Sequence, residues 1–320
     1  MQKLKKIEGR IMRDSYFKAC TPGMLAFCVI IQAGTAQAQH IDIRWDPSGQ
    51  LTIYGTHLND EIRVHIEEPF LRFHFRTVGG NVPWWAEPTS SGYANYRVLK
   101  PYVNKILFFG YAGDDRFTHD QGVRDSGLPR VELYGGDGND RLYGSVYNDF
   151  INGGGEDDDI HSFAGSDVLF GDVGNDQLYG GSGDDFLCGG GGADWLYGEN
   201  GNDWIFRDSS DRRVHFGNGS GDRGFDEPCS YWPIFVAGYW VPGEGLNYGL
   251  FFADRGIFVF PGADVPFFEF GLYGDQPIVW DWNNDGIDDA GVVRNGVLYQ
   301  DIGPRGYQGV DPREYIGIPW

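Results

Sequence analysis

The chain has 320 residues, a formal net charge of −21 and 50 glycines. The glycine content is more than twice the usual level of roughly 7%, and an aromatic content of 16% supplies apolar surface to bury, which excludes a disordered linker. A negative charge of this size disfavours binding to nucleic acid and to anionic membranes, and it favours cations. Turn-rich β structure is therefore the expected class.

Residues 1–38 predict a signal peptide. A basic start is followed by an apolar run at residues 24–31 and by the small-x-small sequence Ala36-Gln37-Ala38. The apolar run is far shorter than the roughly 20 residues that span a bilayer, so the pattern favours an exported chain cleaved after Ala38 over a membrane anchor. We expect no integral membrane segment in the mature chain, and a secreted, cell-surface or periplasmic location.

Residues 39–134 are predicted to form an N-terminal β region. Segments such as residues 71–75 alternate apolar and polar side chains, as strands and hairpins do. Asp60 and Asp115 each stand two residues before an apolar residue, Ile62 and Phe117, which is the spacing that recurs downstream. We expect this region to start a solenoid and to cap its end.

Residues 135–206 are eight contiguous units of nine residues. Each unit has a glycine-rich opening, and every unit has Leu or Ile at its eighth place. Such regularity indicates an internal repeat. The sixth place is aspartate without exception: Asp140, Asp149, Asp158, Asp167, Asp176, Asp185, Asp194 and Asp203.

This spacing constrains the shape of the array. Glycines permit tight turns, and the last three residues of each unit form a short strand with the aliphatic side chain on one face. Two units make one coil, and stacked coils bring the strands together in parallel around a thin aliphatic core. The turns aim carboxylate and carbonyl oxygens at a shared gap, which suits Ca²⁺ better than Mg²⁺ and couples metal binding to folding.

The array resembles the GGxGxDxUx repeats of RTX (hemolysin-type) calcium-binding proteins, which fold as parallel β-rolls. The resemblance implies ions between adjacent coils, each shared by units i and i+2, and about six ions in all. Tyr147, Glu156 and Ser162-Phe163 depart from the glycine positions of the motif. The implied ligand pairs are Asp140/Asp158, Asp158/Asp176, Asp176/Asp194, Asp149/Asp167, Asp167/Asp185 and Asp185/Asp203. Asp60 and Asp115 are secondary metal candidates.

The two outer faces of the array differ in polarity. The seventh places of the odd units are mostly polar, whereas those of the even units are Phe150, Val168, Phe186 and Trp204. An exposed apolar row marks a contact surface, so another part of the chain is expected to cover it, with a carbohydrate-binding strip as the alternative. Cys188 lies on this face, and a disulfide to Cys229 is plausible in an oxidising compartment.

Downstream of the array, residues 207–232 read as a polar linker, and residues 233–320 as a small C-terminal β domain packed on the roll. This domain holds two repeats offset by 42 to 44 residues. The second copy resembles the calcium loop of FG-GAP/VCBS-type repeats, and the equivalent stretch of the first copy lacks the aspartates. The resemblance implies one further Ca²⁺ bound by Asp281, Asn283, Asp285 and Asp289 side chains and the Ile287 carbonyl.

The sequence contains no His-Glu-x-x-His motif, Gly-x-Ser-x-Gly motif or phosphate-binding loop, so no catalytic residues are predicted. The predicted fold is all-β: a parallel β-roll of nonapeptide repeats, flanked by an N-terminal β cap and a small C-terminal β-repeat domain. The predicted function is calcium binding by an exported structural or cell-surface interaction module that extracellular Ca²⁺ folds. Cell-surface glycans or proteins are candidate partners. The alternatives are a secreted polysaccharide-acting enzyme and a carbohydrate-binding adhesin on the same scaffold.

Overall fold

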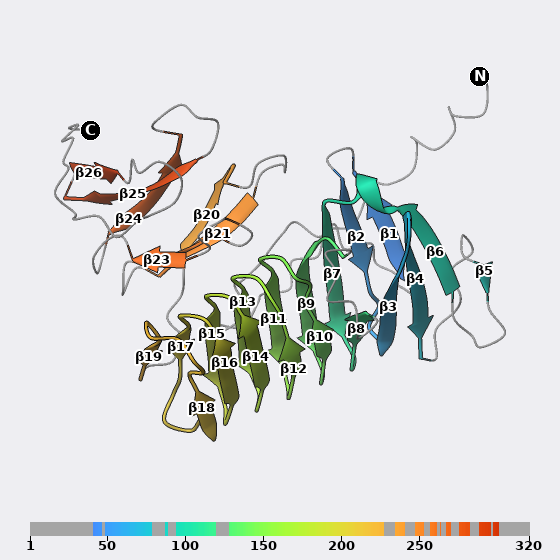
Figure 1. The fold of residues 1–320 in the computed structure, drawn as a ribbon, viewed down its shortest axis with the longest axis horizontal. Helices are drawn as coiled ribbons and strands as arrows, with labels where there is room; N and C mark the ends of the chain where they lie inside the picture. Colours follow the sequence, from blue (N-terminus) through green and yellow to red (C-terminus); the bar gives the residue numbers. More distant parts are fainter. Residues whose placement is uncertain are drawn as a thin grey trace, which may run out of the picture.

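The computed structural model describes residues 41–46, 49–78, 87–88, 94–119, 128–226, 234–240, 247–252, 257–260, 263, 267–269, 275–281, 288–295 and 297–300. Within these ranges, every element is a strand except one short 3₁₀ helix, η1 (Lys100–Tyr102). No helix in this part of the chain is long and apolar enough to cross a bilayer. The all-β prediction is confirmed (Figure 1).

Two long sheets face each other across an aliphatic core and form the roll (Figure 1). Sheet I has the order β1 (Asp42–Trp45), β2 (Gln50–Tyr54), β7 (Lys105–Ala112), β9 (Arg130–Asp137), β11 (Phe150–Gly155), β13 (Val168–Val173), β15 (Phe186–Gly191), β17 (Trp204–Phe206) and β19 (Arg223–Phe225). Sheet II has the order β18 (Arg213–His215), β16 (Trp195–Asn200), β14 (Gln177–Ser182), β12 (Asp159–His161), β10 (Arg141–Tyr143), β8 (Arg116–His119), β3 (Asp60–Glu67), β4 (Phe70–Thr77), β6 (Ala94–Leu99) and β5 (Glu87–Pro88).

The register of the parallel strands shows that one coil contains two units. Leu169 lies opposite Leu187 in sheet I, and Leu178 lies opposite Leu196 in sheet II, so partners are 18 residues apart. All eight of the eighth-place aliphatics have 0% exposure and form the interior between the sheets. A roll of parallel strands around an aliphatic ladder is therefore present over the whole array.

The roll extends beyond the array at both ends. Upstream, β2 and β7 join sheet I in parallel, β3 and β8 join sheet II, and the antiparallel strands β4, β6 and β5 end sheet II. Downstream, the linker prediction fails for residues 207–226, because β18 pairs with β16 and β19 pairs with β17 in parallel. The aspartates of these two coils stand 17 and 19 residues after their predecessors, which hides the repeat from a fixed period.

The C-terminal region forms two antiparallel sheets. Sheet III comprises β20 (Ile234–Gly238), β21 (Asn247–Phe252), β22 (Ile257–Val259) and β23 (Phe267–Glu269). Sheet IV comprises β24 (Gln276–Trp280), β25 (Asp289–Arg294) and β26 (Val297–Gln300). The hairpins β20–β21 and β24–β25 begin 42 residues apart and have the same pairing, as two copies of one repeat do.

Sheet III is the middle of three layers. Alternate side chains of β21 face opposite ways: Leu250 and Phe252 pack on the apolar face of sheet I, whereas Phe251 packs toward sheet IV. The partners on sheet I include Phe150, Val168, Phe170, Phe186 and Phe206. Sheet III lies over this face (Figure 1). The prediction that another part of the chain covers the face is therefore confirmed. The alternative of a carbohydrate-binding strip is wrong there, because Phe150, Val168 and Phe186 are buried and Trp204 is partly buried.

Candidate metal site

The sixth-place aspartates form two internal rows, one beside each sheet. Within a row, the backbone N–H of each aspartate donates to Oδ1 of the aspartate one coil later, over 2.7 to 3.2 Å. The structure therefore brings together all six predicted pairs. The first row is Asp60, Asp115, Asp140, Asp158, Asp176, Asp194 and Asp211. The second row is Asp149, Asp167, Asp185, Asp203 and Asp222.

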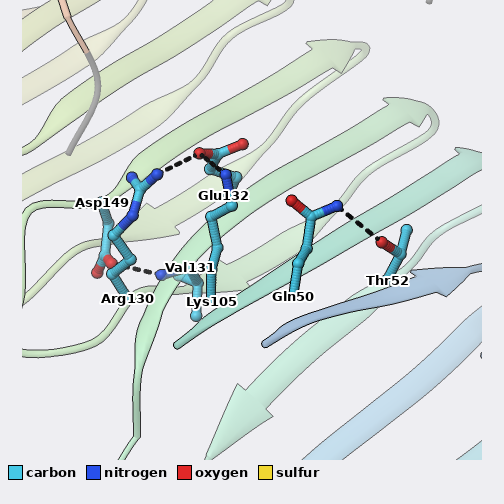
Figure 2. Close-up of polar contacts among 7 residues, drawn as sticks. All are labelled: Gln50, Thr52, Lys105, Arg130, Val131, Glu132 and Asp149. Atoms are coloured by element: carbon cyan, nitrogen blue, oxygen red, sulfur yellow. Dashed lines mark hydrogen bonds and ion pairs between the residues drawn. The ribbon is translucent and has the colours of Figure 1, made fainter. Parts of the chain in front are cut away.

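The second row begins at Asp149, whose Oδ1 accepts from a backbone N–H that does not belong to an aspartate. Asp149 Oδ1 accepts a hydrogen bond of 2.7 Å from the backbone N–H of Val131 (Figure 2). Beside it, the Arg130 guanidinium and the Lys105 ammonium both donate to Glu132, at 2.7 and 3.1 Å. Burial raises the pKa of Asp149 to about 7, and the charge of Arg130 opposes that shift.

The second carboxylate oxygen is the unusual feature of these rows. Oδ2 is buried and has no hydrogen-bond partner among the residues that the structure describes at Asp115, Asp140, Asp158, Asp167, Asp176, Asp185, Asp194 and Asp203. A buried carboxylate without a partner is costly, so the group requires either a proton or a cation.

Burial raises the pKa of the Asp158 and Asp185 carboxyls to about 9, and that of Asp176 to about 7. Repulsion from neighbouring aspartates adds to the effect of burial on the pKa of Asp158. Backbone N–H groups that donate to the carboxylates act in the opposite direction. Near neutral pH, the Asp158 and Asp185 carboxyls therefore hold protons, and the Asp176 carboxyl does so in part, unless a cation takes the place of the proton.

Backbone oxygens gather at the same points. A Cβ added at Gly135 would overlap Asp140 Oδ2, and it would lie 2.6 Å from the Gly153 carbonyl oxygen of the next coil. The same relation holds at Gly171, beside Asp176 Oδ2 and the Gly189 carbonyl. Among the described residues, no three His, Cys, Asp or Glu side chains converge as a metal cluster. The donors that the turns offer are carboxylate and carbonyl oxygens, which are the ligands of Ca²⁺.

Two turns are closed by a hydroxyl residue. At Ser145, the backbone N–H donates to Asp149 Oδ2, Oγ donates to Asp149 Oδ1 at 2.9 Å, and the N–H of Tyr147 donates to Oγ at 3.1 Å. Thr56 repeats the pattern, with its N–H and its hydroxyl both donating to Asp60. Both oxygens of Asp60 and Asp149 have protein donors, so these two aspartates fit a cation poorly, whereas Asp115 fits well. At both turns the backbone N–H of the second-place residue donates to Oδ2, and its hydroxyl donates to Oδ1.

The fifth place of each unit carries an outer ladder that the sequence analysis missed. Asn175 N–H donates to Asp157 Oδ1 at 2.8 Å, and Asn202 N–H donates to Asp184 Oδ1 at 2.7 Å. Hydrogen bonds from the Asn175 backbone and side chain lower the pKa of Asp157. Here the later coil donates to the earlier one, opposite to the inner rows. The fifth column is Asn or Asp in six of the eight units, and this preference was the available signal.

The remaining site predictions stay open. Asp281 and Asp289 lie at the two ends of the β24–β25 connection, but Asn283, Asp285 and Ile287 lie outside the described residues. Asp288 instead ties the two hairpins together, because its Oδ2 accepts from the backbone N–H of Tyr239 at 2.7 Å. Cys188 is disulfide-bonded, and Cys229 lies outside the described residues, so their pairing stays a prediction.

Comparison with known proteins bears on this array. The family model described as RTX calcium-binding nonapeptide repeat (4 copies) matches residues 134–162, 161–196 and 189–211. No curated protein and no solved structure matches the chain. Residues 134–211 are thus RTX calcium-binding nonapeptide repeats, folded as the β-roll that such repeats imply.

Proposed function

We propose that this chain is an exported β-roll that binds Ca²⁺ between adjacent coils, is stabilised by it outside the cell, and acts as a structural or cell-surface interaction module. One observation carries the proposal: eight buried carboxylate oxygens lie in register, each without a hydrogen-bond donor in the described part of the chain. A ladder of unneutralised carboxylates opposes its own assembly, whereas divalent ions bound only by the folded state stabilise that state.

The hydrogen-bond pattern refines the assignment of the ions. A pair of adjacent aspartates is a site when both have a donor-free Oδ2. That criterion removes Asp149/Asp167, because Ser145 satisfies Asp149. It adds Asp115/Asp140, so the number of proposed ions stays at about six. The proposed sites are Asp115/Asp140, Asp140/Asp158, Asp158/Asp176, Asp176/Asp194, Asp167/Asp185 and Asp185/Asp203.

Export follows from the affinity expected of such turns together with the N-terminal pattern. Extracellular calcium modules bind with dissociation constants of roughly 10⁻⁴–10⁻³ M, which cytosolic calcium does not fill. Residues 1–38 have the basic start, apolar run and cleavage sequence of a secretory signal. The roll therefore remains incompletely loaded in the cell, and it gains its ions after export.

The test is a calcium titration of the full chain, followed by circular dichroism and by calorimetry. We expect a cooperative gain of β signal, with about six ions bound in the roll. Asp158→Asn removes a ligand shared by two proposed sites, so the number of bound ions falls. Asp60→Asn is the matched control, because Thr56 and Thr77 already donate to that carboxylate. A flat titration, or equal loss of ions in both variants, contradicts the proposal.

A further inference from the structure

The outer face of sheet II carries one continuous row of side chains across the roll. Strand register places these residues directly opposite one another on neighbouring strands from β4 to β18. In order they are Arg76, Glu61, Arg116, Arg141, Asp159, Gln177, Trp195 and Arg213. From β6 to β18 the face spans nine strands, which at about 4.8 Å per strand is about 38 Å.

This face is cationic on a protein of net charge −21. The outward positions of β3, β4, β6, β8, β10, β12 and β18 hold seven arginines against three carboxylates, Glu61, Glu67 and Asp159. Each carboxylate is shared by two cationic or titratable side chains, as Glu61 is by Arg63 and Arg76. The arginines are Arg63, Arg72, Arg76, Arg97, Arg116, Arg141 and Arg213. Pairing inside the patch therefore leaves an excess of positive charge.

The arginines are both accessible and held in place. The side chains of Arg63, Arg72, Arg76, Arg97 and Arg141 are between 36% and 47% exposed. Arg97 lies over the Phe70 ring at 4.3 Å, and Arg141 Nε donates to Asp159 at 2.8 Å. A guanidinium fixed by stacking and by one ion pair keeps further N–H groups for a second carboxylate, and it loses little entropy on binding it.

On the strands β12, β14 and β16 of this face, the rings of His161, Tyr179 and Tyr197 stack on one another. Tyr179 stacks on Tyr197 with centroids 4.7 Å apart and on His161 at 4.3 Å, in nearly parallel planes. Because the ring faces contact one another, the ladder presents ring edges and polar atoms to solvent. Nucleobases need free ring faces on which to stack, so this ladder favours a hydrogen-bonding polymer over single-stranded nucleic acid.

We propose that the outer face of sheet II binds an extended acidic polysaccharide along the roll axis, with its carboxylates on the arginines. A pyranose unit is close in length to the spacing of about 4.8 Å between strands, whereas each strand of duplex DNA rises about 3.4 Å per phosphate. The inference rests on the proposed function and gives the interaction module a partner class.

Calcium couples the two sites. A groove that joins this face to the first row of turns is lined by Arg116, Arg141, Trp195, Asp114, Asp140 and Asp158. Divalent ions bound at Asp140 and Asp158 displace protons and add positive charge beside the arginines, which attracts an anionic polymer. Calcium-loaded protein therefore binds the polymer more tightly than protein in chelator.

The test uses the full chain at saturating calcium and short oligogalacturonate as the acidic probe. Its methyl ester serves as the uncharged probe with the same backbone. The double variant R97Q/R141Q removes two arginines from the face, and R44Q/R207Q removes two exposed arginines elsewhere that also each pair with one aspartate. We expect R97Q/R141Q to weaken oligogalacturonate binding by about tenfold or more, because charge-assisted hydrogen bonds are lost. The control variant R44Q/R207Q should change it by about twofold or less. R97K/R141K keeps the charge but loses the planar guanidinium donors, so it should weaken binding more than the control and less than R97Q/R141Q.

Three outcomes overturn the inference: no binding of oligogalacturonate to the wild-type chain, equal binding of the methyl ester, or tighter binding to single-stranded DNA or to phosphatidylserine vesicles. Calcium titration of each variant is run alongside. Calcium binding without polysaccharide binding refutes this inference alone. Absence of calcium binding refutes the proposed function.

Discussion

The substitution Ser145→Ala tests whether hydrogen bonds from Ser145, without an ion, stabilise one turn of the roll. Ser145 is 3% exposed, and its Oγ both donates to Asp149 at 2.9 Å and accepts from Tyr147 N–H at 3.1 Å. Hydrogen bonds to charged groups contribute about 1.5–3 kcal/mol each and neutral ones about 1 kcal/mol. The variant should therefore lose about 2–4 kcal/mol of unfolding free energy.

Calcium dependence separates this loss from the loss of an ion. Above the dissociation constant, each ion bound only by the folded state adds about 1.4 kcal/mol of stability per tenfold rise in free calcium. Ser145→Ala should lower the free energy of unfolding by a constant amount and leave that slope unchanged. Asp176→Asn removes a ligand shared by two proposed sites and should reduce the slope by one to two ions, or about 1.4–2.8 kcal/mol per decade.

The assay is urea unfolding, monitored by tryptophan fluorescence, at several buffered calcium concentrations. Equal denaturant m-values for the variants would show that the same surface unfolds in each. If Ser145→Ala changed the slope, Asp149 would be an ion ligand and the hydroxyl-closed turn would be misassigned. If Asp176→Asn left the slope unchanged, the donor-free oxygen would not mark a metal site.

Two further predictions concern pH and the covering sheet. Burial raises the pKa of Asp140 and Asp176 from 3.8 to about 7, so the folded calcium-free roll binds more protons than the unfolded chain. The stability of the calcium-free roll should fall as pH rises from about 4 to about 7, while calcium binding tightens and releases protons. Calorimetry in buffers of different ionisation enthalpy measures the proton release. Calcium binding that is independent of pH and releases no protons would contradict the raised pKa values. Phe252 is 4% exposed, with its ring 5.9 Å from that of Phe186, so Phe252→Ala should cost about 3–5 kcal/mol in urea unfolding and increase ANS fluorescence. Tyr239→Ala, at an exposed position, is its control and should have little effect; equal costs would mean that sheet III does not seal sheet I.

The regular part of the fold was predictable because one physical period governs it. A coil of 18 residues needs an aspartate at each turn and an aliphatic at each strand, and both columns are unbroken over residues 135–206. The same nine-residue period predicted that the two outer faces of the roll differ in polarity, including the apolar face that sheet III covers. The spacing of residues was enough to predict the structure wherever the aspartate and aliphatic positions repeat every nine residues.

The sequence was less informative where the repeat spacing shifted and where local hydrogen bonds differ between units. Asp211 and Asp222 occupy the rows one residue out of phase, so the last coils were assigned to a linker. The metal site at Asp149 stays a prediction, and the spacing could not show that Ser145 at the second place donates to both of its carboxylate oxygens. The arginine face could not be read from the array, because most of its members come from β3, β4 and β6, which only the folded register brings beside the repeats.

The opposed hydrogen-bond ladders give the roll a direction. In the inner rows, the N–H of Asp158 donates forward to the next coil, whereas in the outer ladder Asn175 donates back to the previous one. Cutting the roll from its C-terminal end would strand buried N–H groups, whereas cutting it from the N-terminal end would strand carboxylates. The two ends are chemically unlike, so fragments of this roll should join head to tail and never head to head.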